Sequence, residues 1–213
     1  MFGSNAGRWV PLMEKFPMRA RALLPLLLIA LPTAAFAHTR HGDTSGFLHG
    51  FMHPVGGTDH IPAMVAVGVF AYVLGGRALW LVPLSFVLMM AVGFLLGLGQ
   101  VDMPFVELGI ALSSVVIGAA AAWGRPMPVA AAMSLVGVFA IFHGHAHGAE
   151  MPVDSSGLEY AAGFIVATAL LHAVGIGAAM GAAKLVGRYG KLVAQVAGGL
   201  FALAGVGVLA GWL

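Results

Sequence analysis

The stretch LWLVPLSFVLMMAVGFLLGL, residues 79–98, contains no charged side chain. About 20 apolar residues in a helix span the roughly 30 Å hydrocarbon core of a bilayer, and backbone groups in lipid must bond to one another, so the stretch is predicted to be a membrane-spanning helix. The whole chain of 213 residues has this character, with 60% hydrophobic and 8% charged residues. A soluble domain carries about 25% charged residues, so the composition excludes an ordinary soluble enzyme and also a disordered chain.

Similar apolar stretches, separated by short polar turns, continue to the end of the sequence. We expect spans at 58–75, 79–98, 104–123, 128–147, 158–183 and 191–212. The predicted fold is therefore an all-α polytopic membrane helical bundle with about six transmembrane helices and no separate soluble domain. Pairs of glycines four residues apart indicate close helix packing, at Gly93/Gly97, Gly144/Gly148, Gly177/Gly181 and Gly207/Gly211.

Residues 1–37 have the pattern of a signal peptide. Arg19 and Arg21 precede the apolar run 22–31, and the sequence AFA at 35–37 fits a small-residue cleavage site. The apolar run is too short to cross a bilayer. Cleavage would leave a mature transmembrane domain at 38–213, whereas an uncleaved signal anchor is the alternative.

The basic residues support an orientation. Four of the ten basic residues and one of the eight acidic residues lie in 1–37, so the formal charge of +2 becomes −1 without that segment. Five of the remaining six basic residues fall in three alternate loops, at Arg77, Arg125, Lys184, Arg188 and Lys191. The acidic residues fall in or near the opposite half, at Asp43, Asp59, Asp102, Glu107, Glu150, Asp154 and Glu159. The positive-inside rule then predicts a multi-pass protein of a bacterial inner (cytoplasmic) membrane with a periplasmic mature N-terminus.

The first polar cluster is HPVGGTDH at 53–60. Its proline and glycines predict that the chain here is not a continuous helix, and such backbone at membrane depth must be buried or line a wet cavity. Asp59 suits a helix N-terminus, and taken alone Asp59 and His60 could be a helix cap and a satisfied polar residue. Together with His53 they favour a functional site. Secondary candidates four residues from these histidines are His49 and Met64.

The second polar cluster is FHGHAHGAE at 142–150. His143 and His147 are four residues apart and share a helical face, a spacing that lets two imidazoles reach one metal ion. His145 points elsewhere if the helix persists, although the flanking glycines could loosen the helix end and bring it back. A polar helix terminus is the alternative for this cluster. His172, alone inside an apolar span, is either a packing hydrogen bond or an inner pathway step.

The residue types of both clusters suit a transition-metal ion. Eight of the nine histidines fall in the predicted outer half, at His38, His41, His49, His53, His60, His143, His145 and His147. Neutral imidazole suits nickel, copper and zinc, and the absence of cysteine fits passage of an ion better than storage. We expect imidazoles and carboxylates from distant parts of the chain to converge on one cavity open to the periplasm. Cleavage after Ala37 would make His38 and His41 a further capture site, whereas Glu107 and Glu159 either balance cationic charge or simply lie at the interface.

Both motifs resemble the signatures of the HupE/UreJ family. Residues 53–60 have the form H-P-x-x-G-x-D-H, residues 142–150 resemble the second signature, and the resemblance covers essentially the whole chain. Members are accessory membrane proteins of hydrogenase and urease systems and are regarded as nickel, sometimes cobalt, permeases. The resemblance implies metal ligands at His53, Asp59, His60, His143, His147 and Glu150. It gives no support to His145, which occupies a variable position.

The leading hypothesis is a secondary-type permease for divalent transition-metal ions that takes up nickel from periplasm to cytoplasm for hydrogenase or urease maturation. No phosphate-binding motif G-x-x-x-x-G-K-[ST] is present, and two charges moving through 100 mV release about 4.6 kcal/mol. We expect no permanently bound cofactor, a Ni²⁺ substrate with Co²⁺ and Zn²⁺ as alternatives, the bilayer as surroundings, no nucleic acid, and an indirect link to maturation proteins. The sequence is compatible with a homo-oligomer and does not specify one.

Two other classes of function stay open. An intramembrane zinc hydrolase would need an acid or base outside the ligand set, and the only polar pair deep in a span, Ser113 and Ser114, could simply bond to helix carbonyls. A metal sensor, or a metal-binding subunit of a larger importer, cannot be distinguished from a permease by sequence.

Overall fold

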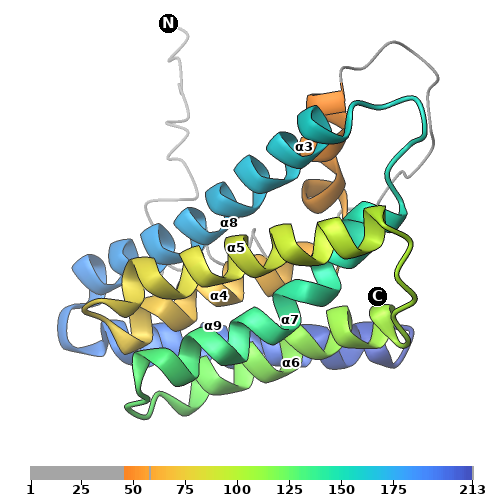
Figure 1. The fold of residues 1–213 in the computed structure, drawn as a ribbon. Helices are drawn as coiled ribbons and strands as arrows, with labels where there is room; N and C mark the ends of the chain where they lie inside the picture. Colours follow the sequence, from red (N-terminus) through yellow and green to blue (C-terminus); the bar gives the residue numbers. More distant parts are fainter. Residues whose placement is uncertain (1–45, 58, 213) are drawn as a thin grey trace, which may run out of the picture. The chain divides into compact units, whose positions relative to one another are not determined.

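The computed structural model describes residues 46–57 and 59–212, and this part of the chain is built of helices without a strand (Figure 1). In chain order these are α3 (Gly46–Gly56), α4 (His60–Leu74), α5 (Ala78–Leu98), α6 (Val106–Trp123), α7 (Val129–Ala149), α8 (Gly157–Val186), the short 3-10 helix η2 (Gly187–Tyr189) and α9 (Gly190–Leu209). The helices α4 to α9 follow the six predicted stretches closely. The predicted signal peptide, with His38 and His41, lies outside the described residues.

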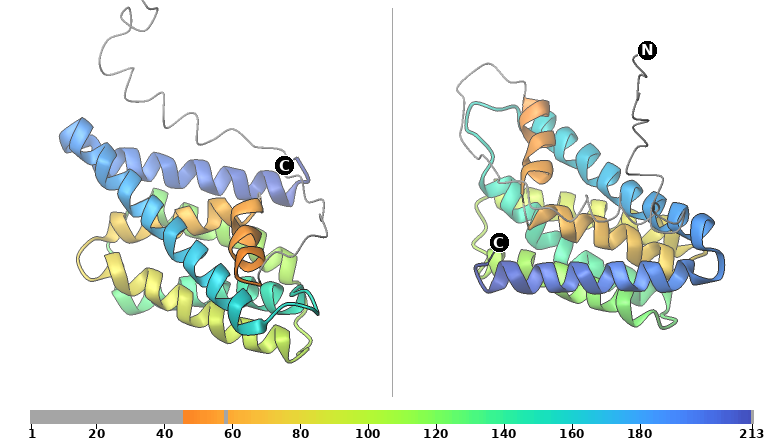
Figure 2. Two further views of the ribbon diagram at one scale, coloured as in Figure 1. Left: turned by 90° about the horizontal axis from the view of Figure 1, so that it is seen from above. Right: turned by 180° about the vertical axis from the view of Figure 1, so that it is seen from behind.

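Several helices are long and apolar enough to cross a membrane. Within the described residues these are α5, α6, α7 and the 53-residue run Gly157–Leu209, and a fifth is obtained if α3 and α4, which are bent by 78°, form one broken span. The run Gly157–Leu209 is far longer than the roughly 20 residues that a crossing requires, and the chain turns back at η2 (Figures 1 and 2). The described residues therefore form the polytopic helical membrane fold expected from composition.

The predicted break in the stretch 53–60 is present, but Pro54 itself lies within a helix. The chain stays helical through Pro54 as far as Gly56, and Gly57 and Asp59 lie outside the two helices. A proline removes a single backbone hydrogen bond, and close contact with α8 supports α3 around it. Gly50 lies so near the Tyr160 carbonyl that a Cβ would overlap it. Helix α3 is thus a separate packed element rather than an extended lead-in.

Glycines bring the helices into backbone contact. Gly93 and Gly97 of α5 lie against carbonyls of α7, and Gly144 and Gly148 of α7 lie against carbonyls of α5, so both predicted pairs serve one interface. The predicted packing role of Gly177 and Gly181 is wrong for the described residues, where an added Cβ at either position would meet no atom within 4 Å. Glycines at the crossing of α4 and α8 are Gly68 and Gly175.

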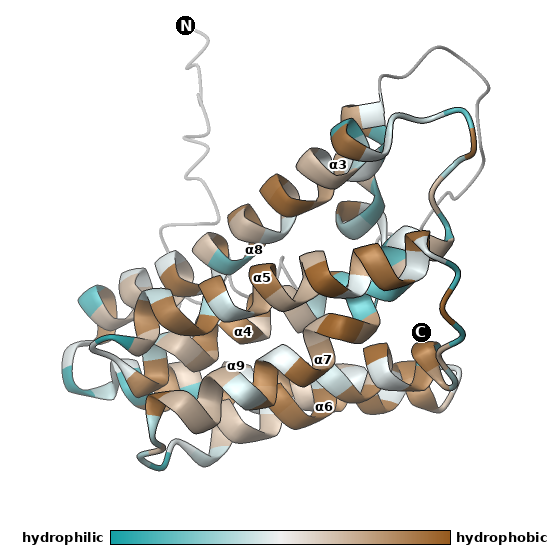
Figure 3. Cartoon of the chain, viewed as in Figure 1, coloured by the Kyte–Doolittle hydropathy of each residue, from teal (hydrophilic) through white to brown (hydrophobic). Residues whose placement is uncertain are grey.

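The loops form two ends of opposite charge. Figures 1 and 2 show the turns α4–α5, α6–α7 and α8–α9 at one end, and the loops α5–α6 and α7–α8 at the other. Arg77, Arg125 and Arg188 belong to the first end, whereas the loops of the second carry Asp102 and Asp154. Hydrophilic residues gather toward these ends and apolar residues cover the helices between them (Figure 3). The arrangement of charge matches the predicted loops.

Candidate metal site

Three histidines from three helices meet toward the acidic end. They are His53 of α3, His60 of α4 and His147 of α7, and one ring nitrogen from each lies within 4.8 Å of the others. The ring centroids are 4.7 Å apart for His53 and His147, 5.3 Å for His60 and His147, and 5.7 Å for His53 and His60. The rings of His60 and His147 are buried, and that of His53 is half-buried. Residues far apart in the sequence are thus brought within reach of one ion.

The orientation of His60 follows from the start of α4. Asp59 caps this helix, because its Oδ1 accepts a hydrogen bond from the His60 backbone N–H at 2.9 Å. The same oxygen lies 2.8 Å from His60 Nδ1, and since an ionised carboxylate only accepts, Nδ1 carries the hydrogen. The Nε2 atom therefore keeps its lone pair. Carboxylates that hold metal-binding histidines in this way are common partners behind metal ligands.

Gly57 makes room for this pair. A Cβ at Gly57 would lie 2.9 Å from both Asp59 Oδ1 and His60 Nδ1, closer than side chains tolerate. The glycine in the break between α3 and α4 therefore leaves the room that the Asp59 and His60 side chains occupy.

The buried ring nitrogens of the cluster lack protein partners. Within the described residues, His60 Nε2 and both ring nitrogens of His147 are buried and without a hydrogen bond. His147 is fully buried, and its ring stacks on Phe164 with centroids 4.7 Å apart and planes 2° apart. Buried polar atoms normally have a partner, because leaving one unpaired costs about 1–3 kcal/mol. A bound ion would satisfy the lone pair of His60 Nε2 and the one lone pair that a neutral His147 ring carries.

Glu150 stands at the edge of the cluster. Its Oε2 lies 3.5 Å from His53 Nε2, and its side chain is half-exposed at the end of α7. Partial burial, and then the carboxylate of Glu107, raise the pKa of Glu150 above its ordinary value. A cation held by the histidines would favour its charged form. Glu107 itself lies in the first turn of α6.

His143 lies one turn deeper along α7. Its ring centroid is 5.0 Å from that of His60, and its Nε2 is 2.9 Å from the hydroxyl of Ser113. The centroid of the Phe86 ring lies 5.6 Å from that of His143 and 5.1 Å from that of His172. His172 is 1% exposed, and among the described residues neither of its ring nitrogens has a partner. A series of histidines therefore continues from the cluster into the interior.

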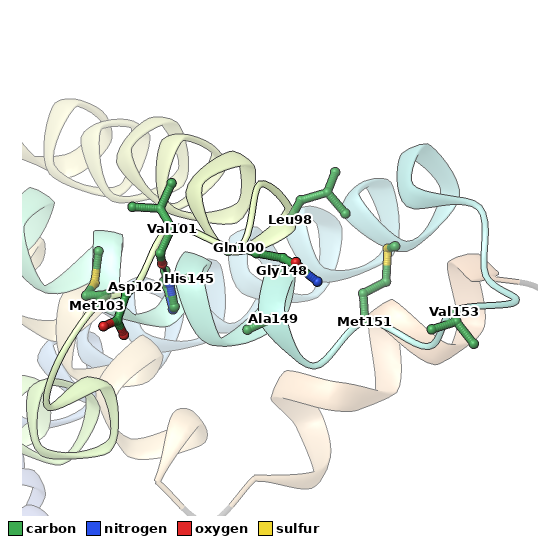
Figure 4. Close-up of a pocket in the computed structure, with 11 residues that line it drawn as sticks. Leu98, Gln100, Val101, Asp102, Met103, His145, Gly148, Ala149, Met151 and Val153 are labelled. Carbon is green, nitrogen blue, oxygen red and sulfur yellow. Dashed lines mark hydrogen bonds between the residues drawn. The ribbon is translucent and has the colours of Figure 1, made fainter.

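His145 points away from the cluster. Helix α7 persists through Ala149, and His145 Nε2 lies 2.7 Å from the Val101 carbonyl in the α5–α6 loop, so the expected loosening of the helix end does not occur. His145 lines a hollow of about 550 Å³ together with Asp102 and Met103 (Figure 4). In the described part of the chain this hollow is lined by none of the three clustered histidines. His145 thus points elsewhere than the cluster, as expected for a helix that persists to its end.

Two secondary candidates also lie apart. His49 is exposed on α3, with its ring 6.1 Å from that of Tyr160. Met64 is fully buried in the hydrophobic core. Two residues near the cluster were not predicted as part of it. Ser113 holds His143, and Tyr160 is a buried neighbour whose ring lies 6.4 Å from His53. A polar residue inside an apolar span was the only sequence signal for Ser113, and Tyr160 had none.

The fold and the site define a polytopic membrane protein with a buried histidine cluster suited to a transition-metal ion. The family model for HupE / UreJ protein matches residues 26–208. Protein HupE of Rhizobium leguminosarum bv. viciae is 46% identical over 187 residues, which cover 87% of this chain and 95% of that protein. The chain belongs to the HupE/UreJ family, as its two motifs predicted. No solved structure matches the chain.

Family membership also fixes the broad class of function. HupE/UreJ proteins are transport and accessory proteins of hydrogenase and urease systems and not enzymes. The expectation of a non-enzymatic, nickel-associated membrane protein is therefore confirmed, and the zinc hydrolase is not carried further.

Proposed function

We propose that this protein is a secondary permease that carries Ni²⁺ from the periplasm to the cytoplasm for hydrogenase or urease maturation. The observation that carries the proposal is the convergence of His53, His60 and His147, with ligand nitrogens within 4.8 Å of one another. Neutral imidazole is a good ligand for nickel, and it releases the ion more readily than thiolate would. Cobalt and zinc suit the same ligands, so nickel is chosen over them on family membership.

The proposed binding site uses the three histidines as ligands, with Glu150 at its outer edge. Asp59 orients His60 through the 2.8 Å contact to Nδ1 and contributes negative charge from behind the ring. The ion then passes to His143, whose ring is 5.0 Å from that of His60, and onward to His172. The step from His60 to His143 exchanges one imidazole for another, and the ring of Phe86 contacts both His143 and His172 along the step that follows.

The proposed topology has six crossings, one for each helix from α4 to α9. Helix α3 then enters the membrane from the outer face and ends at the bend before α4. The acidic end faces the periplasm and the basic end faces the cytoplasm of a bacterial inner membrane, in accord with the positive-inside rule. A cleaved signal peptide over 1–37 agrees with this orientation. The membrane potential then drives a divalent cation inward, with about 4.6 kcal/mol per ion at 100 mV.

The test is uptake of radioactive ⁶³Ni²⁺ by cells that lack other nickel importers and express the full chain. We expect His60→Ala and His143→Ala to abolish most of the uptake. His49→Ala is the matched control, since this histidine is exposed and lies apart from the cluster. Unchanged uptake in both His60→Ala and His143→Ala would contradict the proposal. Uptake by vesicles that contain only the purified protein would separate a permease from a sensor or an importer subunit.

A further inference from the structure

The contact between Ser113 and His143 carries information about which ring nitrogen binds the ion. Ser113 lies in the middle of α6 and is fully buried. Its hydroxyl donates to the Ile110 carbonyl, three residues earlier in the same helix. The hydroxyl oxygen is also 2.9 Å from His143 Nε2. Serine therefore bridges the helix backbone and the imidazole.

A serine hydroxyl has one hydrogen to donate. Because that hydrogen is directed to the Ile110 carbonyl, the oxygen can only accept from His143, so Nε2 carries the ring hydrogen. Nδ1 then keeps its lone pair. The opposite tautomer would place a hydrogen on Nδ1, which is buried and has no acceptor within the described residues. It would also take the serine hydrogen away from the Ile110 carbonyl.

His60 and His143 are therefore held in complementary ways. Asp59 fixes the hydrogen of His60 on Nδ1, so that its lone pair is on Nε2. Ser113 fixes the hydrogen of His143 on Nε2, so that its lone pair is on Nδ1. The two rings are edge-on, with centroids 5.0 Å apart and planes at 84°. Both partners leave a lone pair on the nitrogen that they do not hold.

We propose that Ser113 is a positioning residue that fixes the tautomer of His143 and so presents its Nδ1 to the metal ion beside His60. The proposal rests on the proposed function, because it takes that nitrogen to be a ligand of the transported ion. Ser113 does not touch the ion; it acts through the imidazole. A neutral hydroxyl sets the tautomer without adding charge, which distinguishes it from Asp59 at the neighbouring histidine.

The experiment uses the purified full chain in detergent, labelled with ¹⁵N-histidine. Long-range ¹H–¹⁵N spectra report which nitrogen of a neutral imidazole carries the hydrogen, and His143→Gln assigns the signal. We expect His143 to be the Nε2–H tautomer in the natural protein and a mixture of tautomers in Ser113→Ala. Ser113→Thr should restore the single tautomer, because threonine keeps the hydroxyl and can also bond to the carbonyl three residues earlier.

The same proteins are titrated with Ni²⁺, and we expect Ser113→Ala to weaken binding about tenfold, the lower limit of effects from residues behind metal ligands. Ser85→Ala is the control, since Ser85 is also buried and donates to a carbonyl three residues earlier, Val82, at 2.8 Å. Unchanged binding or an unchanged tautomer in Ser113→Ala would overturn the proposal, as would equal weakening in Ser85→Ala. Weakened Ni²⁺ binding by Ser113→Ala would support the role of Ser113. If cells that express the natural chain then took up no ⁶³Ni²⁺, transport alone would be contradicted.

Discussion

His145 and His147 lie two residues apart on one helix and face different surroundings. His147 belongs to the three-histidine cluster, whereas His145 bonds to the Val101 carbonyl. We expect His147→Gln to reduce ⁶³Ni²⁺ uptake to the background of cells without the protein, because a ligand is lost from the site. His145→Gln is the matched control and should keep most of the uptake, since glutamine can still donate to the carbonyl. Equal losses in the two variants would contradict the separation of the two histidines.

Gly57 gives a test of the geometry around Asp59 and His60. A Cβ there would lie 2.9 Å from two side-chain atoms of this pair, and its three nearest atoms all belong to the side chains of Asp59 and His60. We expect Gly57→Ala to weaken Ni²⁺ binding at least tenfold, as expected for loss of a partner behind a ligand, while the unfolding temperature changes little. The measurement is a Ni²⁺ titration of the purified protein.

Gly56 supplies the control for that substitution. A Cβ at Gly56 would meet no atom of the described residues within 4 Å. Gly56→Ala should therefore bind Ni²⁺ like the natural chain. Normal binding by Gly57→Ala would show that the pair does not need this space.

At this scale the sequence predicted which histidines could share a face, and it could not predict their hydrogen-bond partners. The four-residue spacing of His143 and His147 fixes their face on any helix. The partner of His143 is on α6, thirty residues away, and nothing local in the sequence specifies such a pairing. Tyr160 was missed for the same reason.

The interface of α5 and α7 is the element on which the position of the second motif depends. Gly144 lies against the Met90 carbonyl, and a Cβ at this position would overlap the backbone of α5. We expect Gly144→Ala to destabilise the protein by about 3 kcal/mol, the upper part of the range for overpacking. The measurement is the thermal unfolding midpoint of the purified protein in detergent.

Gly181 is the matched control on α8. An added Cβ would meet no atom of the described part within 4 Å, so Gly181→Ala should be neutral or slightly stabilising, because alanine favours the helix. A fall in the midpoint for Gly181→Ala equal to that for Gly144→Ala would mean that both glycines pack against a neighbour.

The helices α4 to α9 could be predicted because each is a long apolar stretch bounded by polar turns. The sequence predicted the break within 53–60 but did not predict the helix α3 that precedes it. A helix of 11 residues has little stability of its own, and contact with α8 through Gly50 and Gly163 supplies the rest. Such tertiary support is not visible in local sequence. The glycine pairs show the same limit. Both pairs have the four-residue spacing, but among the described residues only Gly144 and Gly148 pack against the backbone of a neighbouring helix, whereas Gly177 and Gly181 do not.

The proposed orientation in the membrane rests on the opposite charges of the two ends of the molecule. The natural chain contains no cysteine, so single cysteines can be introduced without a background. We expect Val153→Cys, in the α7–α8 loop at the acidic end, to react with a membrane-impermeant thiol reagent added to intact cells. Tyr189→Cys, at the basic end, should react only after the cells are opened. Both positions are exposed. The reverse pattern would invert the proposed direction of transport.

The central claim concerns the convergence of His53, His60 and His147 on one ion. Nickel K-edge X-ray absorption of the purified full chain loaded with one Ni²⁺ tests it most directly, because imidazole rings give characteristic multiple scattering. We expect nitrogen ligands with scattering from about three imidazoles at roughly 2.0–2.1 Å, the distance typical of histidine on a divalent metal, and a weaker imidazole signal in His147→Gln. A spectrum of oxygen ligands alone, or one that His147→Gln leaves unchanged, would contradict the claim.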